Sequence, residues 1–213
     1  MVDVTESSRD AGEGPAAEGQ SAAWKIVAAV VVWFGCWCLT PGLRADGIGS
    51  LFTADDEASV LIETLVALSL VLLLLALHRR YNRELFARSR WLWAYVLPIA
   101  AGIALPSHYG LSLPVALYMF WMTVSVFWQD YLTFGLLQKY LAERLPVWAV
   151  LVGSAAIFWA GHALLLPDSF GPTQVLPSVS ILVLGFILAS LRVWTGTLHL
   201  ILALHLTFYF IFA

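Results

Sequence analysis

The sequence predicts an all-α fold, a polytopic bundle of about seven transmembrane helices. The chain has 213 residues, of which 61% are hydrophobic and only 12% are charged. A typical soluble domain carries about 25% charged residues. The apolar residues are also gathered into runs that approach or exceed the roughly 18 residues of a membrane-spanning helix. We therefore expect a multi-pass protein of the cell membrane, with the lipid bilayer as its surroundings.

The chain divides into a short tail and a transmembrane domain. Residues 1–22 are rich in Ser, Gly, Ala, Asp and Glu and lack apolar periodicity, so we expect a disordered acidic cytoplasmic tail. The transmembrane domain is expected at 23–213, and no internal repeat is evident in it. Its apolar runs lie at about 24–40, 59–77, 91–105, 111–137, 147–166, 176–191 and 197–213. The run at 91–105 is short and contains Pro98, so it would span only with tilt or local thinning of the bilayer.

The positions of Lys and Arg predict the orientation of the bundle. If seven helices cross from a cytoplasmic N-terminus, only Arg44 of the 11 basic residues falls on the outer side. Cytoplasmic loops of membrane proteins carry an excess of Lys and Arg. We therefore expect a cytoplasmic N-terminus, a cytoplasmic loop at 78–90 and an extracytoplasmic C-terminus.

Three polar residues from three predicted helices fall at one depth. If the inner boundary lies near Lys139, a helical rise of 1.5 Å per residue places Asp130 roughly 13 Å inside it. The same count places His205 roughly 12 Å in, and His162 reaches the level of Asp130 in the next helix. A lone intramembrane histidine is as often a helix–helix hydrogen-bonding group, but an intramembrane acid indicates function by default. Glu63, near an outer helix end, is expected to reach the interface by snorkelling.

Three motifs follow one another in the C-terminal part of the chain. They are QDYLTFG at 129–135, FWAGH at 158–162 and HLTFY at 205–209. Their order and spacing resemble those of the CPBP family, the CAAX-protease and bacteriocin-processing intramembrane glutamic endopeptidases. The resemblance covers about 91–213 and implies a CPBP-like core there. It also implies an endopeptidase without a cofactor, which processes membrane-associated peptides or proteins.

The resemblance implies roles for individual positions, and the sequence departs from the family at four of them. In such proteases a Glu and the first His activate water, a second acid and an Arg support them, and a late His and an Asn stabilise the oxyanion. Here the first Glu is Gln129, the second acid is Asp130, the Arg is Phe134 and the Asn is Tyr209. Both histidines are retained.

The remaining groups still allow a catalytic site. We expect Asp130, His162 and His205 to face one cavity, because an Asp–His pair sharing a proton is a suitable general base. Gln129 can orient a water or a substrate carbonyl. Tyr209 lies one turn from His205 and can donate to an oxyanion in place of Asn.

Other functions fit the same residues. A catalytically inactive relative could use the cavity to bind a membrane peptide, partner or lipid. A proton-coupled transporter is permitted, although the repeats of many transporters are not seen. Two histidines and a carboxylate are also a plausible metal-ligand set, but the resemblance argues against a required metal. The basic residues are dispersed along one membrane face, so no nucleic-acid partner is expected, and the oligomeric state stays open.

Overall fold

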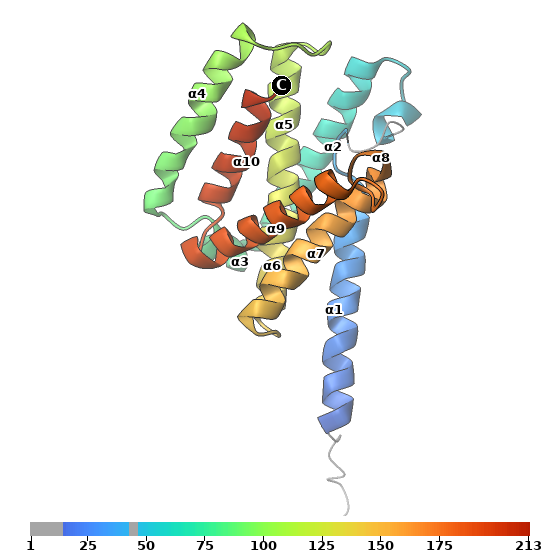
Figure 1. Cartoon of the computed structure of the whole chain (residues 1–213), viewed down its shortest axis with the longest axis vertical. Coiled ribbons are helices and arrows are strands. Elements are labelled where there is room, and N and C mark those ends of the chain that lie inside the picture. Colours follow the sequence, from blue (N-terminus) through green and yellow to red (C-terminus); the bar gives the residue numbers. More distant parts are fainter. Residues whose placement is uncertain (1–14, 43–46) are drawn as a thin grey trace, which may run out of the picture.

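The structure is a computed structural model that describes residues 15–42 and 47–213. Within these ranges the chain is helical and contains no strand, which confirms the predicted all-α class (Figure 1). The α-helices are α1 (Pro15–Trp37), α2 (Asp56–Leu77), α3 (Arg79–Leu85), α4 (Val96–Ala104), α5 (Val115–Asp130), α6 (Gln138–Ala142), α7 (Val147–Leu165), α8 (Pro167–Phe170), α9 (Val175–Thr195) and α10 (His199–Ile211). Shorter segments are the 3-10 helices η1 (Ile48–Leu51), η2 (Arg90–Tyr95) and η3 (Leu105–Ser107) and the π-helix η4 (Tyr131–Leu137).

Each predicted apolar run contains a helix, but the helices differ in their capacity to span a membrane. Three of the described helices, α2, α7 and α9, are long and apolar enough to cross a bilayer alone. The apolar part of α1 and all of α10 are shorter. The run at 91–105 is divided between η2 and the nine-residue α4. The helical membrane bundle is confirmed, whereas the count of seven crossings stays a prediction.

The boundary between tail and helix lies earlier than expected. Residues 1–14 of the predicted tail lie outside the described residues, so the expectation of disorder there stays a prediction. Residues 15–22 belong to α1 instead of the tail. This stretch begins with Pro, which suits the first turn of a helix, and continues with Ala, the strongest helix former. Low hydrophobicity alone therefore misplaced the start of the helix.

Helices α7 and α9 pack tightly against each other, and a glycine lies where they meet. A Cβ atom added at Gly185 would lie 3.0 Å from Cδ1 of Phe158 and 3.3 Å from Cα of Ala155. Small residues allow helix backbones to approach closely within membranes. On the opposite side of the bundle, α10 packs against α4 and α5 and lies between them in Figure 1. These packings bring α5, α7 and α10 into one bundle.

The loop after α1 folds over Glu63. Its carboxylate accepts hydrogen bonds from the backbone N–H groups of Gly42 (2.9 Å) and Gly49 (3.2 Å), and Glu63 is buried. Gly42 has a positive φ of 70° and lies against the side chain of Trp121, so a larger residue would be strained and would clash there. The expectation that Glu63 snorkels to the interface is wrong, because this loop covers it and supplies its donors.

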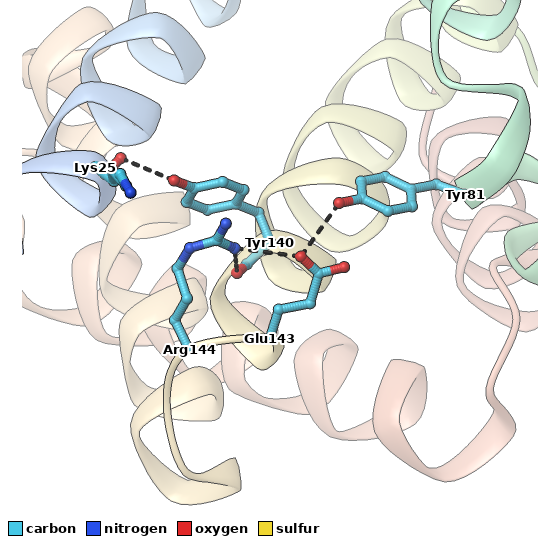
Figure 2. Close-up of polar contacts among 5 residues, drawn as sticks. All are labelled: Lys25, Tyr81, Tyr140, Glu143 and Arg144. Carbon is cyan, nitrogen blue, oxygen red and sulfur yellow. Dashed lines mark hydrogen bonds and ion pairs between the residues drawn. The ribbon is translucent and has the colours of Figure 1, made fainter. Parts of the chain in front are cut away.

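Hydrogen bonds join three helices at the end of the bundle that carries the 142–147 turn (Figure 2). The hydroxyl of Tyr140 in α6 donates to the carbonyl oxygen of Lys25 in α1 (3.2 Å). The hydroxyl of Tyr81 in α3 donates to Oε2 of Glu143 (3.3 Å). Arg144 donates to the Tyr140 carbonyl (2.8 Å) and places its guanidinium 3.6 Å from the centre of the Tyr140 ring. These contacts hold α1, α3 and α6 together.

Candidate functional site

Asp130 and His205 form a buried hydrogen-bonded pair. Asp130 is the last residue of α5, and His205 lies in the middle of α10. Nδ1 of His205 lies 3.0 Å from Oδ1 of Asp130, and the two residues are only 0% and 7% exposed. An imidazole with a proton on Nδ1 donates this bond to the carboxylate. The structure thus brings together two of the three central residues that the sequence predicts.

Two buried oxygen atoms, one in this pair and one on the residue before Asp130, lack a hydrogen-bond partner in the described part of the chain. Within the described residues, neither Oδ2 of Asp130 nor Oε1 of Gln129 makes a hydrogen bond. A buried acceptor without a partner costs about 1–3 kcal/mol. A water molecule or a substrate N–H would satisfy these acceptors. One oxygen of the carboxylate is therefore held by His205, and the other makes no hydrogen bond within the described residues.

His162 is held by its own helix and enclosed by aromatic rings. Its Nδ1 lies 2.9 Å from the carbonyl oxygen of Phe158, so Nδ1 carries the proton and Nε2 of the neutral ring is the acceptor. The ring centroid lies 4.5 Å from that of Phe158, 5.4 Å from that of Trp37 and 5.5 Å from that of Phe170. In the described part of the chain, no hydrogen bond joins His162 directly to Asp130 or His205.

Tyr209 remains beside His205, as its spacing predicts. The two ring centroids lie 5.4 Å apart. The Tyr209 carbonyl accepts a hydrogen bond from the hydroxyl of Tyr118 (3.0 Å), which secures this turn of α10 to α5. Among the described residues, the hydroxyl of Tyr209 has no hydrogen-bond partner.

Phe134 contributes an apolar wall where the family has a cation. It is fully buried, and its ring centroid lies 5.3 Å from that of Phe158. Phe158 in turn contacts His162. At the position of the family's Arg, Phe134 therefore packs behind Phe158, one of the rings that enclose His162.

The helix that carries Gln129 and Asp130 changes its winding directly after them. Residues Tyr131–Leu137 form the π-helix η4, with i→i+5 hydrogen bonding, between α5 and α6. Such segments occur frequently at functional sites. Nε1 of Trp33 in α1 donates to Oγ1 of Thr133 in this segment (3.1 Å). The first helix therefore contacts both the π-helix and, through Trp37, the ring of His162.

Sequence reasoning missed the contribution of α1 to the site. Trp33 and Trp37 are spaced four residues apart, so both lie on one face of α1, and their rings stack with centroids 4.9 Å apart. That spacing indicates an aromatic face, but it does not say which helix the face meets. Nε1 of Trp37 is buried without a hydrogen-bond partner among the described residues.

His199 is buried and lies within hydrogen-bonding distance of two other segments. Its Nε2 lies 3.2 Å from the carbonyl oxygen of Ala87, and its Nδ1 lies 3.4 Å from the hydroxyl of Tyr95. Its position at the start of α10 suggests the membrane interface, but His199 is buried because the connection from α3 to η2 folds over it. In the described part of the chain, no three His, Cys, Asp or Glu side chains are close enough to hold a metal ion together.

These features define a helical membrane protein with a buried carboxylate–imidazole pair. Residues 110–211 match the model of the Rce1-like family, described as type II CAAX prenyl endopeptidase Rce1-like. The chain thus contains an Rce1-like domain, and the resemblance to the CPBP family is confirmed. The match covers all three motifs and begins in the loop before α5. Neither the comparison with curated proteins nor that with solved structures gave a match.

Proposed function

We propose that the protein is an intramembrane endopeptidase that cleaves membrane-associated peptides or proteins with Asp130 as general base. The observation that supports this proposal most directly is that the two oxygen atoms of the Asp130 carboxylate have different surroundings. Oδ1 is held by His205, and Oδ2 is buried without a protein partner. A general base needs one oriented oxygen that is free to accept a hydrogen bond from water, and the free Oδ2 supports this role.

In the proposed reaction, a water molecule donates a hydrogen bond to Oδ2 of Asp130. As the water oxygen bonds to the substrate carbonyl carbon, its proton passes to Asp130, and the carbonyl oxygen becomes an oxyanion. The proton then moves to the amide nitrogen as the C–N bond breaks, which regenerates the carboxylate. His205 holds Asp130 in position throughout.

Two donors are candidates for binding the oxyanion. The side-chain amide of Gln129 precedes Asp130 directly, and the hydroxyl of Tyr209 lies on the ring that packs against His205. Both groups donate hydrogen bonds without a change of protonation. His162, with Nε2 as its acceptor, would orient the attacking water or the substrate from α7.

The second candidate function is peptide or lipid binding without catalysis. The enclosure of His162 by Trp37, Phe158 and Phe170 favours it, because an imidazole packed among rings resembles a binding surface. The buried Phe134, at the position of the family's Arg, favours it too. Cleavage by the intact protein distinguishes the two candidates.

The test is a comparison of peptide N-termini in membranes from cells that express the wild type, Asp130→Asn or Asp168→Asn. Asp168 is exposed at the start of α8, so its substitution is the matched control. We expect a set of new N-termini with the wild type and the control, and none with Asp130→Asn. Thermal unfolding in detergent verifies that all three proteins are folded. If folded Asp130→Asn produces the same N-termini, Asp130 is not the base and the proposal fails.

A further inference from the structure

A groove lies on the protein surface away from the Asp130–His205 pair, where η2, the first turn of α4 and α10 meet. It has a volume of about 550 Å³. Its lining includes Arg90, Trp91, Trp93, Val96, Leu97 and Leu200. The groove is open and large enough for part of a lipid, and its lining contains one cation among aromatic and aliphatic side chains.

The groove has one cationic lining residue, Arg90. The guanidinium of Arg90 lies 4.9 Å from the centre of the Trp91 ring, and Arg90 is exposed. Its neighbour in sequence, Arg88, is exposed as well. No carboxylate lines the groove, and within the described residues Arg90 makes neither an ion pair nor a hydrogen bond. A guanidinium stacked on a ring retains its N–H groups for an anion, and phosphate suits their geometry.

The rest of the groove is apolar and open. Trp93, Val96 and Leu97 are 80%, 55% and 47% exposed. Trp91 packs against Trp194 of α9, with ring centroids 5.0 Å apart. Trp side chains gather where acyl chains meet head groups, and Arg snorkels to that level. The lining therefore combines one cation, Arg90, with the exposed apolar side chains of Val96 and Leu97.

We propose that this groove is a binding site for one anionic phospholipid. Its phosphate would bind Arg90, and an acyl chain would lie along Val96, Leu97 and Leu200. Charge complementarity selects this ligand, because an unpaired guanidinium in the lining of an apolar groove favours a net negative head group over a zwitterionic one. The site is independent of the proposed protease activity.

The test is native mass spectrometry of the full chain in detergent, titrated with phosphatidylglycerol or phosphatidylcholine. We expect one phosphatidylglycerol to bind about tenfold more tightly than phosphatidylcholine, a difference of about 1.4 kcal/mol. Arg90→Gln should remove this preference, whereas Arg83→Gln, an exposed control on α3, should keep it.

A second pair of variants tests the apolar lining of the groove. Leu97→Trp should fill the groove and lower the affinity for phosphatidylglycerol several-fold. Ile103→Trp, at an exposed position of α4 outside the groove, should leave the affinity unchanged. Equal affinities for the two lipids, equal effects of Arg90→Gln and Arg83→Gln, or a protein dimer that is lost with Leu97→Trp would each overturn the proposal.

Discussion

The carboxylate of Asp130 and the imidazole of His205 meet at 3.0 Å although they are 75 positions apart in the chain. Removal of one partner from a buried pair leaves the other without compensation and costs about 3–5 kcal/mol. We expect His205→Leu to lower the free energy of unfolding by this amount. Asp130→Leu combined with His205→Leu should cost less than His205→Leu alone, because no unpaired charge remains. Denaturant unfolding in mixed micelles measures both, and additive losses would contradict a coupled pair.

The position of the family's first Glu offers a gain-of-function test. Gln129→Glu alone should leave cleavage unchanged or lower it, because a second carboxylate beside Asp130 disfavours ionisation of both. Gln129→Glu combined with Phe134→Arg should yield more activity than either single variant, since the guanidinium compensates one carboxylate. The N-terminus comparison described above provides the measurement. A fully active Gln129→Glu single variant would show that residue 134 does not control the site.

Glu63 should stabilise the fold without any part in catalysis. Its carboxylate accepts from two backbone N–H groups, so Glu63→Gln removes one charged acceptor and should cost about 1–3 kcal/mol. Glu57→Gln, at an exposed position of the same helix, should change the free energy of unfolding by less than about 0.5 kcal/mol. Equal effects of the two variants would mean that the hydrogen bonds from Gly42 and Gly49 to Glu63 contribute nothing to the free energy of unfolding.

The ion pair between Glu84 and Lys139 predicts that the stability of the folded protein depends on pH. The hydrogen bond from Lys139, together with its positive charge, lowers the pKa of Glu84 below the ordinary value of 4.5. A carboxylate with a depressed pKa adds stability above its ordinary pKa, and this is lost as pH falls through the lower folded value. Because Glu84 is exposed, the effect should be small. Thermal unfolding between pH 3 and 6 should show it in the wild type and not in Lys139→Gln.

The distribution of Lys and Arg predicts the orientation. A reporter fused after Ala213 should be active only on the extracytoplasmic side, and a cysteine introduced at Arg83 should react only with reagents that reach the cytoplasm. A cytoplasmic reporter would reduce the number of crossings by one. The segment of η2 and α4 is the candidate for that change, because α4 has only nine residues.

Local patterns were sufficient to predict the helices and part of the site. Apolar runs predict helices because the length and hydrophobicity of a membrane helix are properties of a single segment of the sequence. Counting residues from the inner membrane boundary predicted that Asp130 and His205 would share a level, since helical rise is regular. The burial of Glu63 and the enclosure of His162 by Trp37 could not be predicted in this way. Both depend on donors or rings from segments remote in sequence, and no spacing within one helix encodes them.

The π-helix changes the distance between the proposed base and the aqueous phase. A depth of roughly 13 Å for Asp130 assumes that every residue as far as Lys139 advances the chain by 1.5 Å. Residues Tyr131–Leu137 are wound more widely, with i→i+5 hydrogen bonds, so each of them advances the chain by less. If the inner boundary lies near Lys139, Asp130 then lies nearer to it than a count at 1.5 Å per residue gives. In the proposed hydrolysis, each bond cut consumes one water molecule from outside, and this winding would shorten the path along which that water reaches Asp130.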